Sequence, residues 1–233
     1  MTHRDQHTTS LLNFWCLEEY ARFADHVTQT ITMLFSGGQD SMVAVWLLHH
    51  TARAHARRLS ILHYNHLWQR DNFFMAEHAA SVSFWLHCPH VMAMPTYRVD
   101  SERGASHWRG STNTRLTDPN TPHVFVNGHT QSDAHESTLF TFARTLTRHG
   151  PPLTDRGHTP ESVAPVLRPL GRLSRHETGF IVHAHQLPVY PDRVNSTYTN
   201  TRAQIRYIIL PLLAKMGFGT TDHIELPGTR TQN

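Results

Sequence analysis

The sequence predicts an α/β domain built on a doubly wound, mostly parallel sheet, with a small helical extension toward its C-terminal end. Short runs rich in β-branched and aromatic residues alternate with longer helix-like segments, the order that covers both faces of a parallel sheet with helices. The first run, 31–35, ends abruptly in Ser36-Gly37-Gly38. Such an ending is typical of a buried strand that enters a tight turn before a helix.

The elements follow in order along the chain. Predicted strands occupy 31–35, 59–64, 90–94, 123–127 and 166–170. Predicted helices begin at Met42 and then cover 72–86, 133–148, 174–186 and 201–216. Ser174 and Glu177 form a capping box at the start of the fourth helix, and Pro211 interrupts the last one. Segments 95–122 and 150–165 are polar and rich in glycine or proline, which predicts irregular loops.

These elements suggest four parts of the chain. They are an N-terminal extension (1–28), an α/β domain (29–165), a helical extension of that domain (166–216) and a tail (217–233).

Composition limits the possible functions. The 233 residues can form one sizeable domain, and no apolar run approaches the ~20 residues of a membrane helix. The net charge of +3 permits an RNA partner without demonstrating one. The two cysteines, Cys16 and Cys88, are too few for a zinc site or a disulfide framework. We therefore expect no membrane association and a reducing compartment.

The turn at residues 36–41 has the composition of an anion site. Adjacent glycines at 37 and 38 let the backbone approach a phosphate, and the following helix presents its positive end. Ser36 and Ser41 add hydroxyl donors, and Asp40 can hold a divalent cation. The turn lacks the lysine of a Walker loop. The alternative is a plain strand-to-helix turn.

A second group of polar residues follows the fourth predicted strand. Asp133 and Glu136 are three positions apart and share one face near a helix start. Capping of that helix by Ser132 or Asp133 is the alternative reading. Because parallel strands direct their carboxyl ends to one crevice, this turn and the 36–41 turn should face each other. Asp40 and Asp133 are then candidate Mg²⁺ ligands, with Glu136 behind them.

Histidine, arginine and tryptophan side chains supply further candidates. His63 and His66 follow the second strand; they could line the crevice or simply pack there, and a zinc site would need more ligands. Arg202 and Arg206 are four residues apart, so they could contact phosphate together or form a solvated basic face. Trp108 could stack on a flipped base or anchor a loop.

Several blocks, taken in order, resemble known enzymes. The segment Ser36–Ser41 resembles the pyrophosphate (PP) loop, SGGxDS, of the N-type ATP pyrophosphatases. With the later blocks, the chain is similar to the tRNA(Ile)-lysidine synthetase family, and in particular to its short plastid-encoded forms. The matching blocks are His63-Tyr64-Asn65-His66, Gly128-His129 with Asp133 and Glu136, Arg168-Pro169-Leu170 with Ser174-Arg175, and Thr201-Arg202 with Ile205-Arg206.

The resemblance implies that 29–165 is an ATP-binding catalytic domain, and it implies a reaction and roles for individual residues. The family uses ATP and Mg²⁺ to join L-lysine to C2 of the wobble cytidine of tRNA(Ile) with a CAU anticodon. Cytidine is first adenylated with release of pyrophosphate, and the lysine amine then displaces AMP, which changes tRNA identity from Met to Ile. It implies catalytic and metal roles for Asp40 and Asp133 and ATP binding by Ser36, Gly37, Gly38, Gln39, Asp40 and Ser41. It also implies a nucleotide or base pocket at His63, Asn65, His66, Gly128, His129 and Glu136, and tRNA contacts at Arg109, Arg168, Arg202 and Arg206.

Three departures from the family pattern keep an alternative open. Ser132, Ser106 and Ala203 stand where the family has Asp, Arg and Asn. A catalytically impaired nucleotide- or RNA-binding remnant is therefore one alternative, and another PP-loop tRNA-modifying enzyme is a second. A thiolase would need a pair of catalytic cysteines, and no paired motif is present. The resemblance places the protein in the chloroplast stroma, with the bacterial cytoplasm as the alternative; oligomeric state and the lysine pocket are not predicted.

Overall fold

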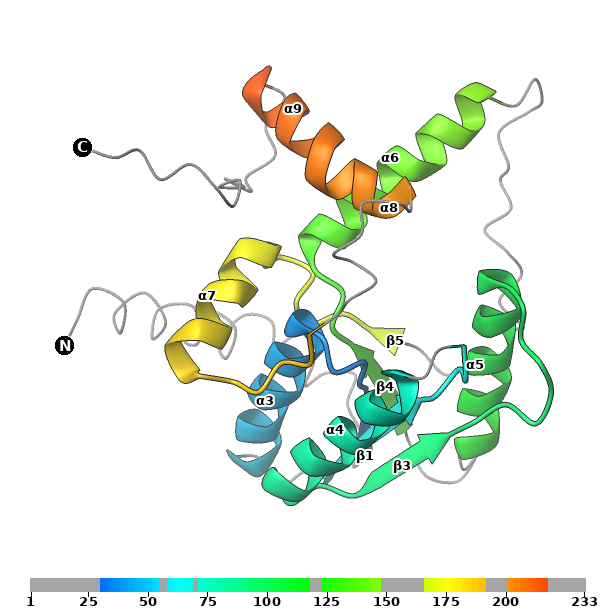
Figure 1. Ribbon diagram of the computed structural model, residues 1–233. Coiled ribbons are helices and arrows are strands. Elements are labelled where there is room, and N and C mark those ends of the chain that lie inside the picture. Colours follow the sequence, from blue (N-terminus) through cyan, green and yellow to red (C-terminus); the bar gives the residue numbers. More distant parts are fainter. Residues whose placement is uncertain are drawn as a thin grey trace.

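The computed structural model describes residues 30–54, 58–68, 71–117, 123–147, 166–191 and 201–217. The predicted N-terminal extension, the loop at 150–165 and nearly all of the tail lie outside these ranges. Within the described residues, a five-stranded sheet forms the centre of the molecule (Figure 1).

The sheet is parallel throughout, as predicted, with strand order β3-β2-β1-β4-β5. Leu34 at the end of β1 is aligned with Leu62 of β2 and Asn127 of β4, so the loops after these strands emerge at one edge. The strands are β1 (Thr30–Leu34), β2 (Arg58–Tyr64), β3 (His90–Ala93), β4 (His123–Asn127) and β5 (Val166–Leu167).

The helices follow the predicted alternation with one addition. They are α3 (Gln39–Ala54), α4 (Asp71–Trp85), α5 (Glu102–Leu116), α6 (Gln131–Thr147), α7 (Arg175–His185), α8 (Thr201–Gln204) and α9 (Leu210–Lys215), with a π-helical turn η2 (Ile205–Ile209) between the last two. The capping box of Ser174 and Glu177 is present at the start of α7, as predicted.

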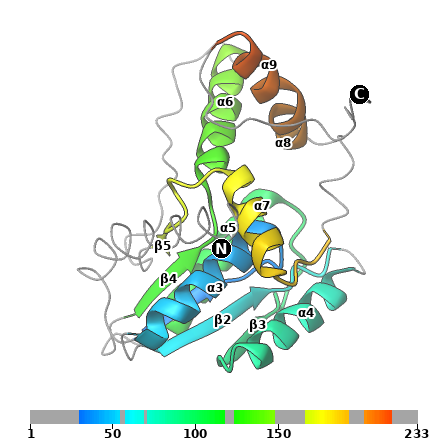
Figure 2. The same cartoon turned by 90° about the vertical axis from the view of Figure 1, so that its left-hand side faces the viewer.

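Helix α3 is buried on almost every side. It lies between the sheet and α7 (Figures 1 and 2). Alternate strand residues such as Ile31, Met33 and Ile61 pack against it and are at most 1% exposed. This double cover explains the unbroken apolar run Met42–Leu48 and ties the start of α7 to the start of α3.

The prediction of an irregular segment at 95–122 is wrong, because α5 occupies residues 102–116. Ser101 caps its first turn by accepting a hydrogen bond from the Gly104 amide. Trp108 is 5% exposed and packs edge-on against Tyr64 at 5.3 Å. Tyr64 points to the sheet face opposite Ile61, so α5 covers the second face. Tertiary packing therefore overrides the glycine-rich composition.

The last strand and the last helix differ in detail from their predictions. Strand β5 ends at Leu167, and Leu170 lies in a turn that packs into the core. Helical structure continues through Pro211, because the turn before it widens: the Leu210 amide bonds to the Ile205 carbonyl, five residues back. A regular α-helix would bring the proline ring against the carbonyl of Tyr207.

Helices α6 and α8–α9 extend away from the sheet and contact each other, as both views show (Figures 1 and 2). Helix α6 begins directly after β4, so its first turn stays at the carboxyl edge of the sheet. The η2 turn packs on α6 close to this edge. Residues from the C-terminal helical segment are thereby brought beside the loops that follow β1 and β4.

Candidate active site

The loop after β1 has the backbone conformation and hydroxyl groups that an anion site requires. Gly37 has φ +86°, a conformation that side-chain-bearing residues rarely adopt, and its carbonyl accepts a hydrogen bond from the Tyr190 amide at 2.9 Å. The Ser36 hydroxyl donates to Ser41 Oγ at 3.0 Å, and Ser41 Oγ lies 2.9 Å from the Gly38 carbonyl. The loop leads into the N-terminus of α3, whose free amides favour a phosphate.

Asp40 occupies the first turn of α3 and is 9% exposed. The Thr178 hydroxyl donates to its Oδ1 at 2.5 Å, and Arg175 Nη1 lies 3.1 Å from its Oδ2. Burial raises the pKa of Asp40, the nearby Arg175 and Thr178 oppose this rise, and the negative charge of Asp133 adds to it. The carboxylate is therefore held in a defined position by two residues of α7.

Further contacts connect α7 to the loops. Gln39 Nε2 donates to the Arg175 carbonyl at 2.8 Å and to Thr178 Oγ1 at 2.9 Å. The Arg175 amide donates to Ser132 Oγ at 3.0 Å. Ser132 thus joins the starts of α6 and α7.

The loop after β4 meets the loop after β1 at Gly128. A Cβ at this position would lie 2.7 Å from Ser41 Cα and 2.9 Å from the Asp40 carbonyl carbon. Both of these neighbours are backbone atoms, so glycine is required for the close approach. Farther along the second loop, Asp133 Oδ2 accepts from the Thr130 amide at 2.8 Å.

Substituting alanine for Gly128 is expected to lower the free energy of unfolding by about 1–3 kcal/mol, because the two loops must separate to admit the methyl group. The melting temperature should fall by about 2–4 °C per kcal/mol. Gly110→Ala is the matched control, since its Cβ would meet nothing within 4 Å in α5. Thermal unfolding of both variants makes the comparison; equal melting temperatures would contradict the close contact.

Arg206 of η2 lies between two carboxylates of α6. Its guanidinium makes a bidentate ion pair with Glu136, which is 3% exposed, and Nη2 lies 3.5 Å from Asp133 Oδ1. Burial would lower the pKa of Arg206, but hydrogen bonds and charge from Glu136, with charge from Asp133, raise it above its usual value. The predicted tRNA contact by Arg206 stays a prediction, and its described partners are acidic.

The predicted base-pocket residues after β2 occupy different environments. His63 Nδ1 donates to the Phe35 carbonyl at 2.9 Å, and burial lowers its pKa, which favours the neutral ring. Asn65 is 1% exposed and organises the following turn. His66 accepts from Arg109 Nη1 at 3.3 Å, which places Arg109 beside the crevice.

The remaining predicted residues are also placed by the structure. His129 lines the crevice and its amide donates to Asn127 Oδ1 at 3.3 Å. Arg168 is exposed in the turn after β5, away from the crevice lining. Arg202 belongs to α8, and its side chain is outside the part that the structure describes. Trp108 anchors α5 in the core, which is the alternative that the sequence left open.

These elements enclose a crevice of about 500 Å³ at the carboxyl edge of the sheet, within the range of small-molecule sites. It brings together the loop after β1, Asp133 and both Arg175 and Arg206. The described residues that line it are Leu34, Phe35, Ser36, Gly38, Gln39, Asp40, Ser41, His63, Tyr64, His66, Met75, Arg109, Asn127, Gly128, His129, Asp133, Arg175 and Arg206. Glu136 lies behind Arg206 and is absent from this lining.

The donor set in the crevice fits a phosphate-bound divalent cation better than an all-protein metal cage. Asp40 and Asp133 both line it, and among the described residues no group of three or more His, Cys, Asp or Glu could hold a metal. Mg²⁺ is commonly bound by one or two carboxylates together with water and substrate phosphates. Two carboxylates facing an anion-binding loop meet that requirement.

Sequence reasoning missed the roles of Arg175 and Thr178. Thr178 bonds to Asp40 across 138 positions of the chain. The capping box predicted the start of α7 correctly but carried no signal about which loop that helix would meet. The unbroken apolar run Met42–Leu48 was the one sequence feature that indicated a second cover over α3, which is buried on almost every side.

A glycine-rich turn after the first strand of a parallel sheet, facing an acidic loop after the fourth, defines a PP-loop type of nucleotide-binding domain. The chain belongs to the PP-loop domain family (ATP_bind_3), whose sequence profile matches residues 15–213. In the described ranges, no helix is long and apolar enough to cross a membrane.

Similar proteins with curated names support this family assignment. The chain is 29% identical over 200 residues to a tRNA(Ile)-lysidine synthase of Synechocystis sp. (83% of this chain, 60% of the relative). It is 31% identical to that of Synechococcus sp. strain JA-2-3B'a(2-13) (81% and 59%) and 22% identical to the chloroplastic enzyme of Pyropia yezoensis (79% and 56%). The chain thus spans less than two thirds of the length of these relatives.

Among solved structures, the chain resembles the U34-tRNA thiolase NcsA of Methanococcus maripaludis, with a TM-score of 0.66, 12% identity, and coverage of 91% of this chain and 73% of that one. It also resembles an NH3-dependent NAD synthetase of Campylobacter jejuni, with a TM-score of 0.51, 12% identity, and coverage of 93% and 86%. At these identities the similarity concerns the fold alone.

Proposed function

We propose that this protein is an ATP-dependent ligase that joins L-lysine to C2 of the wobble cytidine of tRNA(Ile) with a CAU anticodon, forming lysidine. The observation that supports it best is the meeting of Asp40, in the PP loop, with Asp133, from the loop after β4, in one crevice. The similarity to named tRNA(Ile)-lysidine synthases supplies the substrate class. By the same comparison, the protein works in a plastid stroma or a bacterial cytoplasm.

Each part of the crevice has a task in this chemistry. The loop Ser36–Ser41 would hold the triphosphate, whose α-phosphate the cytidine C2 oxygen attacks while pyrophosphate leaves. Asp40 and Asp133 would hold Mg²⁺, which offsets the phosphate charge. The lysine amine then forms a bond to C2 and AMP leaves. The residues that recognise lysine stay outside this proposal.

The direct test uses purified protein, ATP, Mg²⁺, labelled lysine and a tRNA(Ile) transcript with a CAU anticodon. Lysine should enter the RNA, pyrophosphate release should require tRNA, and AMP release with repeated turnover should require lysine as well. An initiator-type tRNA(Met) transcript, which shares the CAU anticodon, serves as the control for tRNA identity. ATP binding without turnover would instead favour the catalytically impaired remnant. That alternative was suggested by Ser132, which stands where the resemblance leads us to expect an acidic residue.

The structure offers no support for a cysteine-dependent thiolase within its described residues. Cys88 lies just before β3, at the amino edge of the sheet and opposite the crevice. Its Sγ lies 3.7 Å from His49 Nδ1, and burial raises the pKa of its thiol, which disfavours a reactive thiolate.

Changing Arg175 to glutamine should shift the pH dependence of the reaction. Arg175 opposes the burial-driven rise of the Asp40 pKa, so its removal lets that pKa rise further. Asp40 must be ionised to hold Mg²⁺. As the pH falls, the variant would therefore lose activity at a higher pH than the unmodified protein does. The acid limb of kcat/KM for pyrophosphate release should move to higher pH. Arg175→Lys is the control that keeps the charge; coincident acid limbs for all three proteins would refute the assignment.

A further inference from the structure

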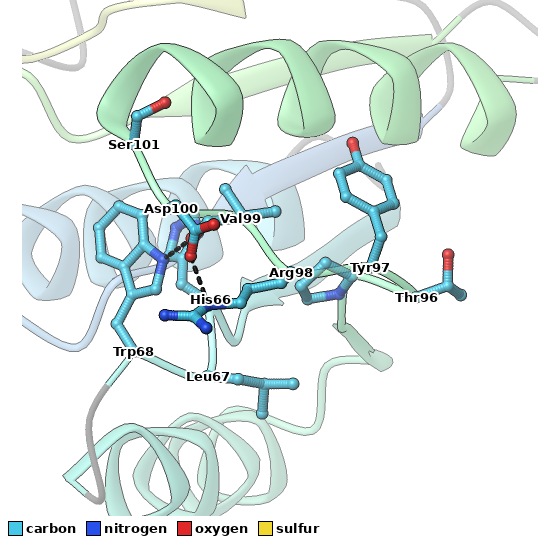
Figure 3. Close-up of a pocket in the computed structure, with 10 residues that line it drawn as sticks. His66, Leu67, Trp68, Thr96, Tyr97, Arg98, Val99, Asp100 and Ser101 are labelled. Atoms are coloured by element: carbon cyan, nitrogen blue, oxygen red, sulfur yellow. Dashed lines mark hydrogen bonds and ion pairs between the residues drawn. The ribbon is translucent and has the colours of Figure 1, made fainter.

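A second hollow, of about 690 Å³, adjoins the crevice. It is formed by the turn after β2 and by the segment between β3 and α5, and His66 lines both spaces. In the view of Figure 3, the rings of Trp68 and Tyr97 stand on opposite sides, with the Arg98 and Asp100 side chains between them. The lining residues are His66, Leu67, Trp68, Pro95, Thr96, Tyr97, Arg98, Val99, Asp100 and Ser101.

The turn that carries Trp68 is held in a strained conformation. Leu67 has φ +58°, which is unusual for a residue with a branched side chain. The conformation is fixed by buried Asn65, whose side-chain Oδ1 accepts from the Leu67 backbone amide at 3.0 Å and whose backbone N–H donates to the Ala93 carbonyl at 2.9 Å. Strain that the surroundings maintain often occurs at ligand sites.

The indole of Trp68 is held in place by neighbouring residues but remains exposed to solvent. Its Nε1–H donates to the Val99 carbonyl at 2.5 Å, and its ring stacks on His66 with centroids 4.8 Å apart and planes 26° apart. The residue is still 45% exposed, and Tyr97 is 55% exposed. Trp68 therefore presents a fixed, accessible ring next to the crevice, and Tyr97 adds a second accessible ring.

The charges around the hollow favour a flat, uncharged ligand. Among its described lining residues, the charged side chains are Arg98 and Asp100, which pair with each other at 2.6 Å and are largely exposed. Within that described lining, no other carboxylate is present to hold an ammonium group such as that of lysine. Arg98 stays close enough to the rim to meet a phosphate of a passing RNA strand.

We propose that this hollow binds one unpaired base next to the target cytidine in the anticodon loop, stacked on Trp68. The inference rests on the proposed function, which places the cytidine in the crevice that shares His66. Proteins read single-stranded RNA mainly by stacking exposed bases on aromatic rings. The volume is within the range that accommodates such a ligand.

The test measures binding of an RNA hairpin with a CAU anticodon loop to the full-length protein at fixed salt. Trp68→Ala should weaken binding by roughly 5- to 150-fold, the range measured for loss of one base stack. Trp68→Phe should recover most of the affinity. Phe84→Ala is the matched control, because Phe84 is an aromatic residue 82% exposed on α4 and outside both lined spaces.

A hairpin lacking one base beside the cytidine separates stacking from a structural effect. Two hairpins are compared, each lacking the base on one side of the cytidine. Trp68→Ala should hardly weaken binding of the hairpin that lacks the stacked base, and should weaken binding of the other hairpin fully. Equal losses for all hairpins, or none, would overturn the inference.

The same variants separate the two proposals. If intact protein transfers lysine to RNA but Trp68→Ala leaves KM for tRNA unchanged, the base site is wrong and the function stands. If no lysine is transferred but the pattern with the modified hairpins holds, the base site stands and the proposed reaction is wrong.

Discussion

Replacing Asp40 with asparagine is expected to slow tRNA-dependent pyrophosphate release by about 10³-fold, a loss of roughly 4 kcal/mol of transition-state stabilisation. The change removes the negative charge that Mg²⁺ requires and keeps the size of the side chain. It also keeps an oxygen that can accept the hydrogen bond from Thr178. The amide nitrogen would take the place of Oδ2 opposite Arg175 Nη1, so a local structural effect has to be separated from the loss of chemistry.

Stability measurements separate these two causes. Burial raises the pKa of Asp40, so its charge is unfavourable in the folded state; a neutral amide removes this cost but also the ion pair with Arg175. These two effects oppose each other, and the melting temperature should change little. Glu77→Gln, at an exposed position of α4, is the control for loss of one carboxylate. Turnover of Asp40→Asn near the rate of the unmodified protein would remove Asp40 from the mechanism.

The fold was largely predictable because its strands are short apolar runs that end in strong turn signals. The strands β1 and β4 lie within one residue of their predicted positions, and the capping box located α7. Helix α5 was missed because its sequence contains Gly104 and Gly110 and few apolar residues. Its helix is stabilised where Trp108 packs against Tyr64 of the sheet, a contact between residues distant in the sequence.

Residues of the candidate site were predictable only where a short sequence motif contains them. The PP loop and Asp133 are read from short motifs at the ends of strands, and strand order then brings them together. The partners of Asp40 come from α7, and that pairing depends on how α7 packs on α3. Arg206 illustrates the same difficulty: its spacing from Arg202 suggested a basic face, whereas η2 directs it toward Glu136.

Replacing Arg206 with methionine is expected to destabilise the protein by about 3–5 kcal/mol, because Glu136 would be left as a buried carboxylate without its partner. Arg206 contacts both oxygens of Glu136, which is 3% exposed. The melting temperature should then fall by roughly 10 °C. Denaturation by urea measures the change, and Arg115→Met, at an exposed position of α5, is the control for loss of one arginine.

The pair can be tested as a unit by replacing both residues with apolar ones. Arg206→Met combined with Glu136→Leu should recover most of the lost stability, because removing both charges avoids the unpaired carboxylate. Activity should stay low in the double variant, since Arg206 also borders the crevice beside Asp133 and its charge is gone. Recovered stability without recovered turnover would separate the structural contribution of this ion pair from its contribution to the reaction. Additive losses in the double variant would instead show that the two side chains do not depend on each other.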